Sequence, residues 1–261
     1  MINTLTLLSL IKPAVLFICD LKRLAYLITV PAAALIVVAA LVYFYPPFYL
    51  AETIQPNVEF NIYILLLIVV FLPFLFASVM LRVQQILFFG EDQEQKRRFF
   101  LPKPDKAMRH YIAVCLQVVL YSLFLSALLS LILIVIVNHF LPLSERAGLL
   151  FIIGTLVFCP YFLVRFILKL PAAAADRSLR WWTAWQMTSG INVVVAVVQI
   201  SFLIFPLIAL FSINMMLQRI LGNTQFMLFT ANFSMIFAAL LACILHAAYC
   251  GYLFSSLISK D

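Results

Sequence analysis

Six apolar stretches, each about 20 residues or longer and almost free of charge, constrain this chain more than any other feature. A helix needs about 20 apolar residues to cross the hydrocarbon core of a bilayer. Backbone groups find no water at that depth, so a helix, which pairs them internally, is the structure expected. The predicted spans are residues 24–44, 60–80, 112–137, 149–168, 191–213 and 226–257.

Composition agrees with a membrane fold and excludes an ordinary soluble one. The chain is 66% hydrophobic and 10% charged, whereas soluble domains are about 45–50% apolar and about 25% charged. We therefore predict one all-α integral membrane domain over residues 1–261, a polytopic bundle with six spans at 24–257. With only six glycines, tight helix packing through glycine is not expected.

The N-terminal segment, residues 1–23, precedes the first predicted span. Its apolar part, residues 5–19, is too short to cross a bilayer and is interrupted by Lys12 and Pro13. We predict that it forms an interfacial or partly buried helix on the cytoplasmic side.

The basic residues predict the orientation. All but two of the 17 Lys and Arg residues fall on one side of a six-span arrangement, the exceptions being Arg146 and Arg219. Lys and Arg are enriched in cytoplasmic loops, so both termini, residues 82–110 and residues 166–190 are predicted to be cytoplasmic.

The net charge of +7 is thus a property of the cytoplasmic face. Topogenesis and contact with anionic inner-leaflet lipids of the phospholipid bilayer explain it. A nucleic-acid partner is not expected, because no folded basic domain is present. In the loop at 82–111, the basic run Lys96, Arg97 and Arg98 follows three acids and predicts either a solvated turn or a surface for lipid or a partner protein.

All three tryptophans lie in a second loop, within a predicted short helix at residues 179–188 with Ser178 as its N-cap. The spacing places Trp181, Trp182 and Trp185 on one helix face. Tryptophan prefers headgroup depth, so an interfacial anchor is favoured over a ligand cage. Arg177 and Arg180 flank this helix and are candidate contacts for lipid phosphates.

The turn before that helix contains a possible ion pair. Pro171 is expected to end the extension of the fourth span. Arg165 and Asp176 bracket this proline, and we predict them as a candidate structural pair across the bend.

Catalytic and cofactor sites are not evident in the sequence. The five cysteines form no CxxC pair, and no Ser/His/Asp set, phosphate-binding loop or zinc-protease motif occurs. Cys243, His246 and Cys250 share one helical stripe, compatible with a metal or haem site or with a packed intramembrane histidine. We favour the packed histidine and expect no cofactor.

Two loop patterns resemble those of bacterial six-helix inner-membrane proteins of the YciC type. One consists of Arg82 followed by LFFGE at 87–91, and the other of Arg165, LPAAAAD at 170–176, Trp185, Thr188, Gly190 and Asn192. The pattern is more loosely similar to membrane domains found beside glycerophosphodiester phosphodiesterases. Here Ile191 separates a Gly-Asn pair that is usually adjacent. The resemblance implies a six-span protein of the bacterial inner membrane and implies no catalytic residue.

Three functional hypotheses follow. A non-enzymatic scaffold or accessory subunit, which binds other membrane proteins or a second copy of itself, fits the missing chemistry and the aromatic, basic inner face. A permease or binding protein for a lipid-like or apolar substrate would also need no buried charge. An intramembrane haem or metal protein using His246 is the third hypothesis.

Overall fold

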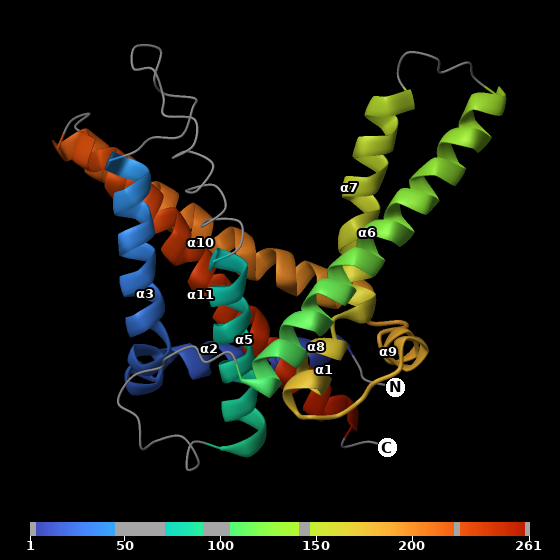
Figure 1. Ribbon diagram of the computed structural model, residues 1–261, viewed down its shortest axis with the longest axis horizontal. Helices are drawn as coiled ribbons and strands as arrows, with labels where there is room; N and C mark the ends of the chain where they lie inside the picture. The colour runs from blue at the N-terminus through green and yellow to red at the C-terminus, as the bar shows by residue number, and fades with distance from the viewer. Residues whose placement is uncertain (1–3, 45–70, 91–104, 141–146, 222–224, 259–261) are drawn as a thin grey trace. The chain divides into compact units, whose positions relative to one another are not determined.

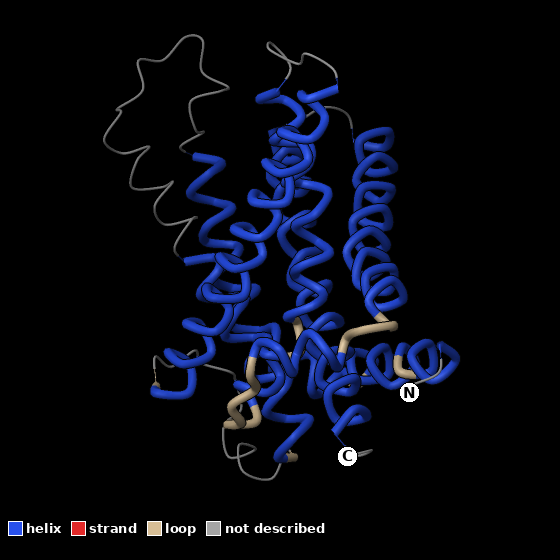
Figure 2. The backbone as a smooth tube through the Cα atoms, turned by 90° about the vertical axis from the view of Figure 1, so that its right-hand side faces the viewer, coloured by secondary structure: helices blue, strands red, loops and turns tan. Residues whose placement is uncertain are grey.

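The computed structural model describes residues 4–44, 71–90, 105–140, 147–221 and 225–258, and no strand occurs in these ranges (Figures 1 and 2). The all-α fold class is confirmed. The helices are α1 (Thr4–Ser9), α2 (Ile11–Cys19), α3 (Leu21–Phe44), α5 (Leu72–Phe89), α6 (Lys106–Phe140), α7 (Ala147–Phe166), α8 (Lys169–Ala174), α9 (Trp181–Met187), α10 (Asn192–Leu221) and α11 (Gln225–Ile258).

Three of these helices contain segments long and apolar enough to cross a membrane: Lys106–Asn138, Ala147–Phe166 and Phe237–Ile258. A fourth span would form if α9 and the start of α10, which meet at a 90° bend, crossed together. The chain is therefore a membrane-embedded helical protein. Helices α3 and α10 coincide closely with the first and fifth predicted spans, whereas residues 60–70 of the second lie outside the described ranges.

The chain divides into two compact units built from segments distant in sequence. Unit 1 comprises Met1–Leu10, Asp105–Val198 and Cys250–Asp261, and unit 2 comprises Ile11–Pro104 and Gln199–Tyr249. The segment predicted as one N-terminal helix forms two, α1 and α2. Pro13 lies in the first turn of α2, where a missing N–H breaks no helical hydrogen bond.

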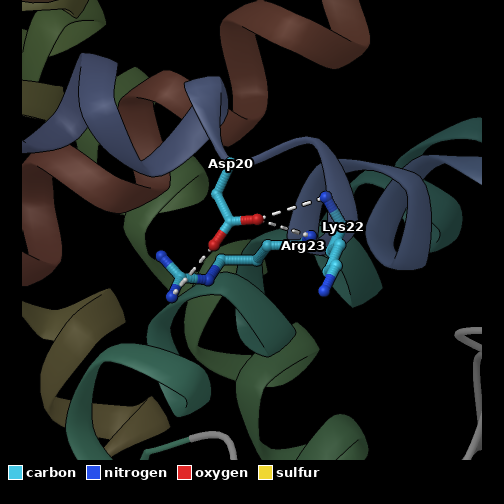
Figure 3. A network of polar contacts seen from close by, with 3 residues as sticks. All are labelled: Asp20, Lys22 and Arg23. Atoms are coloured by element: carbon cyan, nitrogen blue, oxygen red, sulfur yellow. Dashed lines mark hydrogen bonds and ion pairs between the residues drawn. The ribbon is translucent and has the colours of Figure 1, made fainter.

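In unit 2, Asp20 sets the start of α3 (Figure 3). Its carboxylate accepts hydrogen bonds from the backbone N–H groups of Lys22 and Arg23, at 3.1 and 3.3 Å, and pairs with the Arg23 guanidinium at 3.6 Å. Aspartate at this position satisfies N–H groups that have no partner within the helix. Helix α3 then packs against α2 and α5.

Unit 1 is organised around the hairpin of α6 and α7 (Figure 1). Buried Ser122, Ser126 and Ser130 repeat every four residues along one face of α6. Opposite them is Gly154 of α7, where an added Cβ would lie 2.7 Å from the Ser130 Oγ. Small residues let membrane helices approach closely, so the expectation that glycine plays no part in tight helix packing is wrong at this position.

Candidate functional site

Basic and aromatic side chains gather at the end of the hairpin where α6 begins and α7 ends. Helix α8 packs on α6 and α9 packs on α7 at this end (Figure 1). We call the assembly of α8, α9 and the adjoining turns of α6 and α7 the basic–aromatic end. Its local structure follows from two positions with left-handed backbone.

The first such position is Asp176, with φ 54°. Helix α8 ends in a Schellman motif, because the N–H of Arg177 bonds the carbonyl of Ala172 and the N–H of Asp176 bonds that of Ala173. Aspartate tolerates this conformation better than most residues. Pro171 lies inside α8 and does not end the preceding span. The break comes earlier, after Phe166, and the proline occupies the first turn of α8, where it is tolerated.

The second position is Gly190, with φ 83°. An added Cβ there would meet no atom within 4 Å, so the backbone conformation and not crowding explains the glycine. It allows the chain to turn from α9 into α10 at the 90° bend.

Arg165 is the central polar group of the basic–aromatic end. Only 8% of it is exposed. Its Nε and one terminal nitrogen donate to the Tyr161 hydroxyl at 3.2 and 3.0 Å, and the other terminal nitrogen donates to the Trp185 carbonyl at 3.4 Å. The guanidinium also lies over the Trp185 ring, 4.7 Å from its centroid. Arg165 therefore ties α7 to α9.

The predicted pair of Arg165 and Asp176 does not form. The guanidinium is occupied by Tyr161 and Trp185, and within the described ranges no ion pair or hydrogen bond reaches the Asp176 carboxylate. The physical reason is the break after Phe166, beyond which Asp176 lies in the terminal turn of α8, a helix that packs on α6. Asp176 serves the backbone of that turn instead.

Thr188, the C-cap residue of α9, joins the same two helices. Its buried hydroxyl lies 3.1 Å from the carbonyl oxygen of Arg165 and 3.0 Å from that of Ala184. The Arg165 carbonyl belongs to the last turn of α7, where four carbonyl groups have no partner within the helix. The hydroxyl of Thr188 can satisfy this one.

The three tryptophans, predicted to share one helix face, have different surroundings. Trp181 packs against Tyr121 and Phe166, with ring centroids 4.5 and 5.0 Å apart, and Trp185 packs against Phe166 at 5.7 Å. Trp182 is 67% exposed. The short helix itself was predicted at nearly its observed position, but it begins at Trp181. Arg180 is its N-cap residue and makes no side-chain cap, so the assignment of Ser178 as the cap was wrong.

Lys169 connects this aromatic cluster to a pocket. Its ammonium donates to the Leu179 carbonyl at 2.8 Å and lies 4.0 Å from the centroid of the Trp181 ring. Burial lowers the pKa of Lys169 from its ordinary value, because desolvation disfavours the charged form. The pocket, of about 330 Å³, lies between α6, α8 and the turn that follows α8. Its polar lining is His110, Gln117, Lys169, Asp176, Arg177 and Ser178.

The other predicted site residues fall elsewhere. Lys96, Arg97 and Arg98 lie outside the described residues. Arg180 is exposed in the turn before α9 and does not line the pocket. Cys243, His246 and Cys250 lie on α11. Across the described ranges no group of three or more His, Cys, Asp or Glu side chains is arranged to hold a metal ion.

Sequence reasoning missed Tyr161, Lys169 and the structural role of Thr188. Tyr161, Arg165 and Lys169 are spaced four residues apart, which would place them on one face of a continuous helix. A polar stripe of this kind at the end of an apolar span was the available signal.

Comparisons with protein families, with curated proteins and with solved structures find no match to this chain.

Proposed function

We propose that this chain is a non-enzymatic scaffold or accessory subunit of a bacterial inner-membrane complex. In this proposal it spans the membrane six times, with both termini and the basic–aromatic end at the cytoplasmic face. The resemblance of the two loop patterns to YciC-type proteins supports the proposed family and location. The residues of the second pattern also have structural roles. Arg165 donates to the Trp185 carbonyl, Thr188 donates to the Arg165 carbonyl, and Gly190 forms the turn after α9.

One observation carries the proposal: hydrogen bonds fix α9 against α7 at the polar end, while the hairpin of α6 and α7 exposes apolar side chains beyond it. The Arg165 guanidinium donates to the Tyr161 hydroxyl and to the Trp185 carbonyl, and the Thr188 hydroxyl donates to the carbonyls of Arg165 and Ala184. Their polar groups are thus used to fix α7 against α9. Such an end offers a fixed surface rather than reactive groups, as a scaffold requires.

The exposed sides of the hairpin supply the lateral surface. On α7, Ile152, Leu156 and Val157 are 57, 68 and 63% exposed, and on α6 Val135 is 65% exposed. Apolar side chains at a membrane helix surface face lipid or a neighbouring helix. We therefore infer that α6 and α7 offer lateral contacts to a partner membrane protein.

The existence of a partner membrane protein is tested by affinity purification of the tagged, full-length chain in a mild detergent. We expect a membrane protein to co-purify in stoichiometric amount. A matched variant, Leu156→Asn, should reduce that partner's recovery, because it places an amide on the exposed apolar side of α7. Recovery of the chain alone, with lipid but no protein, would favour the permease hypothesis and overturn the scaffold proposal.

The orientation is tested by cysteine accessibility in a background lacking the five native cysteines. Gln95→Cys and Gln186→Cys should react with an impermeant maleimide only after the inner membrane is permeabilised, because the positive-inside distribution places both loops in the cytoplasm. Ser144→Cys, in the predicted external loop, should react in cells whose outer membrane alone is permeable. The reverse pattern would contradict the topology.

A further inference from the structure

The pocket beside α6 contains opposite charges that do not neutralise each other. Lys169 and Arg177 line it together with Asp176, yet within the described part of the chain neither cation pairs with the carboxylate. Of the three N–H groups of the Lys169 ammonium, one donates to the Leu179 carbonyl. The pocket therefore presents two cations and one anion with unused hydrogen-bonding capacity.

The size of the pocket limits its occupant. At about 330 Å³ it is at the lower end of the range of small-molecule sites, about 300–1,000 Å³. It could hold a small polar group but not a whole lipid. Gln117 and Ser178 add neutral donors and acceptors to the lining.

An apolar surface continues the pocket along α6. His110, Val114 and Gln117, which line the pocket, are spaced four and three residues apart. Continuing that spacing along the same face of the helix gives Tyr121, Phe124 and Leu128, which are 49, 65 and 43% exposed. A polar pocket that leads into an exposed apolar stripe matches the shape of a phospholipid, with a headgroup at one end and acyl chains beyond it.

The charge pattern distinguishes between headgroups. Lys169 and Arg177 suit a phosphate group, and Arg in particular binds phosphate oxygens well. The desolvation that lowers the pKa of Lys169 is relieved by an adjacent anion. The Asp176 carboxylate would repel an anionic headgroup that offers it no cation, whereas it would attract an ammonium group.

We propose that this pocket binds the phosphoethanolamine headgroup of one phosphatidylethanolamine molecule, with its phosphate at Lys169 and Arg177, its ammonium at Asp176, and its acyl chains along Tyr121, Phe124 and Leu128. This inference rests on the proposed position of the basic–aromatic end at the membrane interface. It adds a specific lipid to that surface.

The test is lipid titration of the purified full-length chain in detergent, followed by native mass spectrometry. Phosphatidylethanolamine and phosphatidylglycerol with identical acyl chains are the two probes. We expect one phosphatidylethanolamine to bind about tenfold more tightly than phosphatidylglycerol, the scale of one charge-assisted hydrogen bond. Equal binding, or tighter binding of phosphatidylglycerol, would overturn the proposal.

Single substitutions test which residue contacts the phosphate and which contacts the ammonium of the headgroup. Asp176→Asn keeps a residue that tolerates left-handed backbone and should abolish the preference, because it weakens phosphatidylethanolamine binding and relieves the repulsion of phosphatidylglycerol. Arg177→Gln should weaken both lipids about tenfold, because it removes a phosphate contact. Arg180→Gln is the matched control, since Arg180 is an exposed arginine of the same turn that does not line the pocket. If Arg177→Gln behaved like this control, the assignment would be wrong.

Inorganic phosphate and soluble phosphoethanolamine distinguish a lipid from a free anion. Neither should displace the bound lipid even in large molar excess, because neither contacts the apolar stripe. Displacement by inorganic phosphate would show an anion site and overturn the lipid assignment. Failure of the lipid test with the partner protein still co-purifying would refute this inference and leave the scaffold proposal standing.

Discussion

Replacing Arg165 with leucine is expected to destabilise unit 1 by about 2–3 kcal/mol, the scale of losing hydrogen bonds from one buried charged group. The guanidinium makes three hydrogen bonds, two to the Tyr161 hydroxyl and one to the Trp185 carbonyl. Leucine fills some of the space but offers no donor. Relief from burying a charge offsets part of the loss, which is why we do not expect a larger effect.

The measurement is thermal unfolding in mild detergent, followed by the fluorescence of the three tryptophans. At roughly 2–4 °C per kcal/mol for a chain of this size, the midpoint should fall by roughly 5–10 °C. Emission should shift to the red, because α9 loses its attachment to Arg165 and the Trp185 ring becomes more exposed to water. Arg165→Lys should give an intermediate midpoint, since lysine keeps the charge without the planar fork.

Arg180→Leu is the control for the loss of a positive charge. Arg180 is exposed, and exposed substitutions rarely change stability measurably. If Arg165→Leu left the midpoint and the emission as unchanged as this control does, Arg165 would not hold α7 to α9.

Replacing Gly154 with leucine is expected to have an effect of similar or larger size, about 3 kcal/mol, through overpacking. A Cβ at this position would lie 2.7 Å from the Oγ of Ser130 and 3.1 Å from its Cβ. The Ser130 side chain is buried and bonded to the carbonyl of Ser126, so it cannot swing away without losing that bond. The helices must therefore separate, which removes packing that membrane helices depend on for association.

The hairpin supplies its own control at Gly148, also on α7, where an added Cβ meets nothing within 4 Å. Gly148→Leu should leave the unfolding midpoint in detergent nearly unchanged. A double variant tests the contact itself: Ser130→Gly should restore much of the stability lost in Gly154→Ala, because it removes both Ser130 atoms that crowd the new methyl group. Equal destabilisation at Gly148 and Gly154 would contradict close packing through Gly154.

The sequence determined the class of fold because that information is local. Runs of about 20 apolar residues require helices in a bilayer whatever surrounds them, and α3, α6, α7 and α10 lie close to the spans predicted on that basis. The short tryptophan helix was also predicted within a few residues of its bounds, since its apolar spacing is a local property too. The number of membrane crossings stays a prediction.

Tertiary structure decided which side chains contact one another. Arg165 could pair with Asp176 on sequence grounds, but the break after Phe166 and the left-handed turn at Asp176 left the guanidinium to Tyr161 and Trp185. The same packing set Trp181 and Trp185, both half-buried, against other rings and left Trp182 exposed. The close contact between Ser130 and Gly154 could be recognised only from the packing of α6 against α7. In a chain so uniformly apolar, hydropathy specifies which segments are helical but cannot distinguish one helix face from another, so their contacts depend on shape and on a few polar groups.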